Sequence, residues 1–173
     1  MDASPSVDVA LMSGRTGEVL TSDPDSTVVW GEHDYAWFHV PGCQGGSDAY
    51  FATLKDIDLE HWDEVLKHHS RAQSQRDLVR SCLANGRFWV FRRSAGQPGL
   101  INFAYGIIAA SLAELTGGFV FSDNSAWDYE RFPATPEEFY TWYFTPSMAL
   151  HSDFADWAQR CLDSITPIDG APN

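Results

Sequence analysis

The amino-acid sequence predicts an α+β fold, in which helices are layered on a mostly antiparallel sheet within a single domain. Strand-like segments joined by turns come first, and helices interleaved with two further strands follow them. The 173 residues are 44% hydrophobic and 14% aromatic, which is typical of one globular domain with a sizeable core. The predicted domain spans residues 1–173, and we expect residues 1–6 and 166–173 to be frayed ends.

Two hairpins are expected near the N-terminus. Residues 7–12 alternate apolar and polar side chains with a period of two, and residues 18–20 form the returning strand after a turn. Residues 27–30 and 35–40 flank a short connection and form the second hairpin. The glycine-rich residues 41–48 are expected to form a loop.

Apolar residues at helical spacing predict four helices in the rest of the chain: residues 59–69, 75–84, 100–115 and 153–165. Asp58 is expected to cap the first helix, and Ser74 with Asp77 resembles a capping box for the second. Two further strands are expected over residues 87–93 and 119–122.

A fifth, short helix is predicted to begin after Thr135 and to run to Phe144. Thr135 at the cap, Pro136 at the first helical position and a glutamate at the third match a capping box. The helix is aromatic on most sides, so it is either sandwiched in the core or partly exposed as a binding surface. We expect Phe139 and Trp142 to lie in the core, because large aromatic rings dominate protein cores.

The chain carries a net charge of −13. Residues 1–54 hold eight acids and one base, residues 55–93 hold six acids and eight bases, and residues 94–173 hold ten acids and two bases. Nucleic-acid binding requires a basic footprint, and this acidic field argues against it. The same field would speed the encounter with a basic protein, although it also serves solubility alone.

The three cysteines lie far apart in the sequence and form no C-x-x-C motif, so neither a disulfide framework nor a zinc knuckle is expected. The first residues lack the basic, apolar and small-residue order of a secretory signal. No run approaches the roughly 18 consecutive apolar residues of a membrane span. These features predict a cytoplasmic protein that does not bind a membrane.

No catalytic, cofactor-binding or metal-binding motif is recognised. His61 and His68 share a helix face, but about 10 Å of helix rise separates them, and the i, i+4 spacing of a helical zinc site is absent. Cys43 lies in a glycine-rich loop with no flanking catalytic signature. The chain is therefore expected not to be an enzyme, with a small metal-dependent hydrolase using His33, His61 or His68 as the alternative.

Residues 123–144 carry eight aromatic residues and five acids against a single base. Rings that fill pockets and acids that steer and pair are what a protein surface uses to hold a cationic partner. The part before the fifth helix is expected to be a loop, where functional residues concentrate. The predicted partner-binding residues are Asp123, Trp127, Asp128, Tyr129, Glu130 and Glu137.

Roughly residues 88–145, including the motifs AELTGG and WDYERFPATPEEF, resemble small bacterial immunity proteins encoded beside polymorphic toxins of the Rhs, type VI or contact-dependent kind. The resemblance implies a role in bacterial competition: such an antitoxin binds its cognate toxin in the cytosol and blocks the toxin's active site. Immunity proteins share no common functional residues, so none is transferred to this chain.

The sequence thus leads to the hypothesis of an acidic, cytoplasmic immunity protein that occludes a basic toxin domain. A nuclease is the favoured target, because a cleft that holds substrate phosphates is cationic. An adaptor for a basic protein unrelated to toxins is a further alternative. The oligomeric state is left open.

Overall fold

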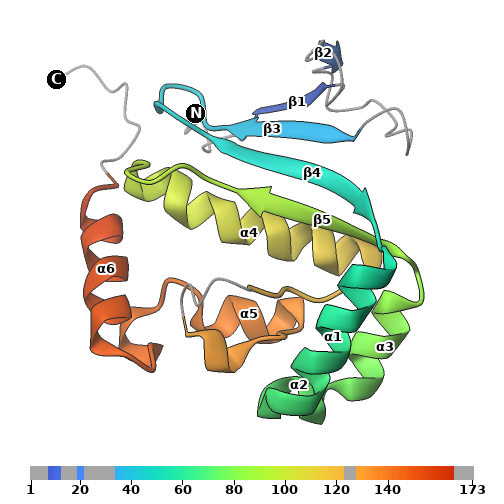
Figure 1. Ribbon diagram of the computed structural model, residues 1–173. Helices are drawn as coiled ribbons and strands as arrows, with labels where there is room; N and C mark the ends of the chain where they lie inside the picture. The colour runs from blue at the N-terminus through green and yellow to red at the C-terminus, as the bar shows by residue number, and fades with distance from the viewer. Residues whose placement is uncertain (1–7, 13–18, 22–33, 123–127, 166–173) are drawn as a thin grey trace, which may run out of the picture. The chain divides into compact units, whose positions relative to one another are not determined.

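The computed structural model describes residues 8–12, 19–21, 34–122 and 128–165, and it confirms the α+β class (Figure 1). The chain groups into two compact units. Unit 1 comprises Met1–Ala52, Trp89–Tyr105 and Arg160–Asn173, and unit 2 comprises Thr53–Phe88 and Gly106–Gln159. The single domain stays a prediction.

A five-stranded sheet has the order β2-β1-β3-β4-β5 (Figure 1). Its strands are β1 (Asp8–Met12), β2 (Val19–Thr21), β3 (Tyr35–His39), β4 (Ser47–Thr53) and β5 (Arg87–Arg92). β1 pairs antiparallel with β2 and β3, and β3 pairs antiparallel with β4. The antiparallel sheet is confirmed, and four of its strands lie within one or two residues of their predicted ranges.

Strand β4 was not predicted, and its first residues were expected to be loop. The buried positions at the start of β4 are the small residues Ser47 and Ala49, and Ala49 pairs with the equally buried Ala36 of β3. Small residues allow close packing but lack the branched or aromatic signal of a strand. Of the other predicted strands, residues 27–30 lie outside the described residues, and residues 119–122 contribute only one isolated bridge, Val120 to Ala134.

In unit 1, aromatic pairs cross the sheet. Phe38 on β3 lies 5.9 Å from Phe91 on β5, and Phe51 on β4 lies 5.7 Å from Trp89, measured between ring centroids. The hydroxyl of Tyr105, on the first turns of α4 (Gly99–Thr116), donates a 3.0 Å hydrogen bond to the Phe91 carbonyl. This bond ties the start of α4 to β5.

Helix α4 is apolar on most sides, with a mean hydropathy of 1.4 over its 18 residues. It is long and apolar enough to cross a membrane, by length and composition only, although the sequence analysis found no such run. Core helices of soluble proteins meet the same criterion, so α4 carries no conclusion about location.

Unit 2 begins with α1 (Asp56–His68), α2 (Ser70–Ser74) and α3 (Arg76–Leu83). Their shared core is Val65, Leu66, Ala72 and Val79, packed against Trp62, Leu83, Phe119 and Phe121. The predicted helix over 75–84 is confirmed within one residue, whereas two predicted caps are wrong. Asp58 lies inside α1 and accepts from the Lys55 amide at 2.8 Å, and Ser74 ends α2 by donating to the Arg71 carbonyl.

The last part of the chain contains η1 (Tyr129–Arg131), α5 (Pro136–Trp142), η2 (Pro146–Met148) and α6 (Ser152–Asp163). The capping box of α5 is confirmed: the Glu138 amide donates to Thr135 Oγ1 at 3.3 Å, and the Thr135 amide donates to Glu138 Oε2 at 3.1 Å. Phe139 and Trp142 are buried, as predicted. The helix ends two residues early, because its C-cap residue Tyr143 is extended with a ψ of 128°, and Phe144 after it has a positive φ of 51°.

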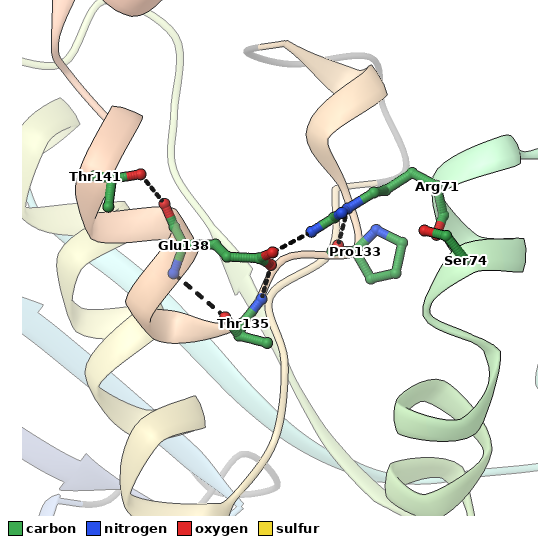
Figure 2. Close-up of polar contacts among 6 residues, drawn as sticks. All are labelled: Arg71, Ser74, Pro133, Thr135, Glu138 and Thr141. Atoms are coloured by element: carbon green, nitrogen blue, oxygen red, sulfur yellow. Dashed lines mark hydrogen bonds and ion pairs between the residues drawn. The ribbon is translucent and has the colours of Figure 1, made fainter.

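Arg71 of α2 joins this capping box (Figure 2). Its Nη2 lies 2.5 Å from Glu138 Oε1, and its Nε donates to the Pro133 carbonyl at 3.4 Å. Glu138 therefore caps α5 with one oxygen and binds α2 with the other. A single carboxylate thus holds together two segments that are 67 residues apart in the sequence.

Neutralising Glu138 should change the pH dependence of stability. Partial burial raises the pKa of Glu138, but the hydrogen bonds from Arg71 and Thr135 outweigh it, and the pKa lies below the usual glutamate value. Because its pKa is lowered in the folded state, the ionised Glu138 carboxylate stabilises the fold at neutral pH. This stabilisation is lost as the pH falls through the pKa of the folded state. We expect the free energy of unfolding of wild type to exceed that of Glu138→Gln at pH 7. The difference should be at most about 1 kcal/mol, because the Glu138 side chain is 40% exposed.

Denaturant unfolding of both proteins between about pH 7 and pH 3 measures the difference, which should shrink below about pH 5. Glu137→Gln is the matched control, because Glu137 is exposed and makes no ion pair among the described residues. A pH profile of Glu138→Gln parallel to that of wild type would contradict the assignment.

Candidate partner-binding surface

Asp128 is completely buried and organises the turn that leads into η1. Its backbone is left-handed, with a φ of 47°, a conformation that aspartate and asparagine tolerate better than most residues. Its Oδ2 accepts hydrogen bonds from the Arg131 side chain at 3.2 Å and from the Leu150 amide at 2.9 Å. A buried carboxylate of this kind needs such partners, because an unpaired buried charge is very costly.

Arg131 adds two contacts to this arrangement. Its guanidinium donates to the Met148 carbonyl and lies over the Trp142 ring, 5.4 Å from the ring centroid. Trp142 in turn packs edge-on against the buried rings of Phe132 and Phe139. We call Asp128, Arg131 and the backbone of Met148 and Leu150 the Asp128 clamp.

The Asp128 clamp brings a set of accessible side chains together. Glu130 is exposed and pairs with the exposed His151 at 3.1 Å. Met148 and Leu150 are 42% and 53% exposed, although both are large and apolar. Tyr129 is half-buried. We call Tyr129, Glu130, Met148, Leu150 and His151 the Tyr129 surface.

His69 supports Tyr129 from the end of α1. The two rings meet edge-on with their centroids 4.6 Å apart, and Phe121 lies 6.2 Å from Tyr129. The His69 Nδ1 also accepts from the Ala72 amide at 3.3 Å and thereby caps α2. This hydrogen bond restrains the imidazole ring against which Tyr129 packs.

Glu130 provides a permanent negative charge at neutral pH. Its own backbone N–H, followed by the hydrogen bond from His151, lowers the pKa of this carboxyl below the usual glutamate value. Glu130 follows Tyr129 in the sequence, and its partner His151 follows the exposed Leu150. A cationic group with an apolar stem, such as lysine or arginine, matches this combination.

The structure describes four of the six predicted partner-binding residues, and their positions differ. Asp123 and Trp127 lie outside the described residues. Asp128 is buried within the Asp128 clamp, so its carboxylate offers no charge to a partner, contrary to the surface role that we expected. Tyr129 and Glu130 lie together, and Glu137 is exposed on the first turn of α5 with no described contact to them.

Met148, Leu150 and His151 were not foreseen. The contact between Asp128 and Leu150 spans 22 residues, and no spacing rule links such positions. The isolated apolar residues that follow Pro146 show no helical or strand period. The burial and the left-handed backbone of Asp128 could not be predicted either, because the sequence WDYER is typical of an exposed acidic loop.

The described part of the chain contains no group of three histidine, cysteine or acidic residues that could hold a metal ion. Among the histidines of α1, His68 pairs with Glu64 at 3.4 Å on the surface, and His61 lies beside Trp62. These contacts are typical of a solvated helix face.

Comparisons with protein-family models, with curated proteins and with solved structures found no match.

Replacing Asp128 should destabilise the protein. Asp128→Ala removes both hydrogen bonds, leaves the Leu150 amide and the Arg131 Nε–H without these acceptors, and places alanine in a left-handed conformation. We expect a loss of about 2–4 kcal/mol in the free energy of unfolding, measured with denaturant. Asp128→Asn is the matched variant: asparagine tolerates the backbone and still accepts from Leu150, so its loss should be roughly half as large. Equal stability of Asp128→Ala and wild type would rule out the Asp128 clamp.

Proposed function

We propose that this chain is an acidic inhibitor of a basic protein, and that the basic protein is a cognate toxin domain, as for the immunity proteins that residues 88–145 resemble. The Tyr129 surface is the contact site. The function is binding and occlusion, and a nuclease domain is the favoured target because its substrate cleft must be cationic.

One observation carries the proposal: an ionised glutamate, a supported tyrosine and two exposed aliphatic residues come from two short segments, 128–131 and 148–151, that Asp128, Arg131 and the Glu130–His151 pair join. Interface hot spots are enriched in aromatic anchors, and nearby charges select the partner and set its orientation. The Asp128 clamp fixes these groups before binding, which reduces the ordering cost of association.

The charge distribution supports a basic partner. Residues 94–173, which contain the Tyr129 surface, hold ten acids and two bases. A field of this sign raises the association rate with cationic proteins and repels nucleic acids. An acidic inhibitor can also compete directly with phosphate groups for a nuclease cleft.

The proposal predicts that Tyr129→Ala combined with Glu130→Gln weakens binding to the partner. The partner to test is the C-terminal domain of the protein encoded immediately upstream of this chain's gene, purified in an inactive form. We expect a loss of about 2–4 kcal/mol, or roughly 30- to 1000-fold in Kd, if the two residues are hot spots. Calorimetry or surface plasmon resonance gives the Kd, and the wild-type Kd should rise with salt.

Tyr140→Ala is the matched control, because Tyr140 is a comparably exposed tyrosine in the same unit that lies outside the Tyr129 surface. Its Kd should equal that of wild type. Co-expression gives the functional readout: wild type should rescue cells from the active domain, and the double variant should not. Absence of both binding and rescue by wild type would overturn the proposed function. Binding to the tested domain without rescue would instead favour an adaptor for a basic protein.

A further inference from the structure

The first turns of α4 lie against one face of the sheet of unit 1, and the opposite face carries a second group of aromatic residues. Phe91 lies on the face that meets α4, because its ring packs edge-on against Tyr105 with the centroids 6.4 Å apart. Phe38 packs against Phe91 and belongs to the same face. Successive side chains of a strand point to opposite faces, so Tyr35 and Trp37 of β3 lie on the other one.

Antiparallel pairing extends this second face onto β4. Trp37 pairs with Asp48, Tyr35 pairs with Tyr50, and residues directly opposite each other share a face. The rings of Tyr35 and Tyr50 meet edge-on with their centroids 5.0 Å apart. Tyr50 is 38% exposed, and the other three side chains are half-buried. We call Tyr35, Trp37, Asp48 and Tyr50 the Trp37 face.

Asp48 provides a carboxylate among these rings. The Tyr35 hydroxyl donates a hydrogen bond to Asp48 Oδ1. Burial, followed by this hydrogen bond, raises the pKa of Tyr35, so the hydroxyl stays protonated and continues to donate. No lysine, arginine or histidine pairs with Asp48 in the part of the chain that the structure describes. Its negative charge is therefore balanced by no ion pair there.

A cation of the chain itself lies on one ring of the Trp37 face. The guanidinium of Arg92, an exposed residue of β5, lies over the Tyr50 ring, 5.5 Å from the ring centroid. A tryptophan ring attracts a cation more strongly than a tyrosine ring does. Among the described residues, Trp37 makes no ring or cation contact. Its indole lies against the backbone of Gly46, where an added Cβ would come within 2.5 Å of the ring.

We propose that the Trp37 face binds an arginine side chain of the basic partner. The guanidinium stacks on the Trp37 indole and donates to the Asp48 carboxylate, while Arg92 stays on the Tyr50 ring. Arginine suits this site better than lysine, because its planar guanidinium is weakly hydrated, stacks on aromatic rings and donates from several N–H groups. The identity of the partner rests on the proposed function, whereas the site itself is defined by unit 1 alone.

The test uses a defined probe, the tripeptide acetyl-Gly-Arg-Gly-amide. Its titration into the isotope-labelled chain, followed by NMR, should shift the indole N–H of Trp37 and the amides of residues 35–37 and 48–50. Asp48→Asn still accepts from Tyr35 but loses the charge, so it should weaken the Kd of the tripeptide about fivefold. Trp37→Leu keeps an apolar side chain but loses the cation–π contact, and it should weaken the Kd by a similar factor.

Asp77→Asn is the matched control, because Asp77 is an exposed aspartate that lies on α3 in unit 2. It should leave the Kd unchanged. The same tripeptide with lysine in place of arginine should bind more weakly, since an ammonium cannot stack as a guanidinium does.

Three results would each overturn the inference: no shifts in residues 35–37 and 48–50, equal Kd values for the two tripeptides, or equal weakening by Asp48→Asn and Asp77→Asn. Rescue of cells by wild type in that event would leave the proposed function standing. Arginine binding at the Trp37 face without partner binding or rescue would leave this site standing and overturn the proposed function alone.

Discussion

The ion pair between the buried Asp128 and the partly buried Arg131 is the constraint on which the Tyr129 surface depends. The carboxylate holds the Leu150 amide, and the guanidinium holds the Met148 carbonyl and covers the Trp142 ring. The aromatic core and the exposed side chains are thereby joined through one pair of charges. Such a pair is weak evidence for stability in itself, but it specifies one arrangement of the two segments. Specificity of this kind is what a binding surface requires.

Arg71 and Glu138 add a second constraint at the other end of the same segment. Glu138 caps the start of α5 and binds Arg71 of α2, while Arg71 also binds the Pro133 carbonyl (Figure 2). The residues between Asp128 and Glu138 are therefore held at both ends by a carboxylate and an arginine. Tyr129 lies between the two pairs and rests on His69. A partner that contacts Tyr129 meets a side chain whose position is fixed before binding.

Local sequence rules succeeded where the interaction is local. The capping box of α5 and the buried faces of Phe139 and Trp142 follow from residues three or four positions apart. Strand β4 escaped prediction because its buried residues are small, and Ser74 was misplaced because a short helix, α2, ends where a new one was expected to begin. The Tyr129 surface was only half predicted: Tyr129 and Glu130 were named, whereas Met148 and Leu150 reach it through contacts across about twenty residues. The burial of Asp128 reverses its expected role for the same reason.

Acidity and accessible apolar side chains together define a surface suited to a basic partner, and the central claim is that this surface is the Tyr129 surface. Hydrogen exchange of the backbone amides, measured for the chain alone and in complex with the upstream-encoded basic domain, tests it most directly. The account predicts that added protection is concentrated in residues 128–131 and 148–151. Formation of a tight complex with unchanged exchange in both segments would contradict it.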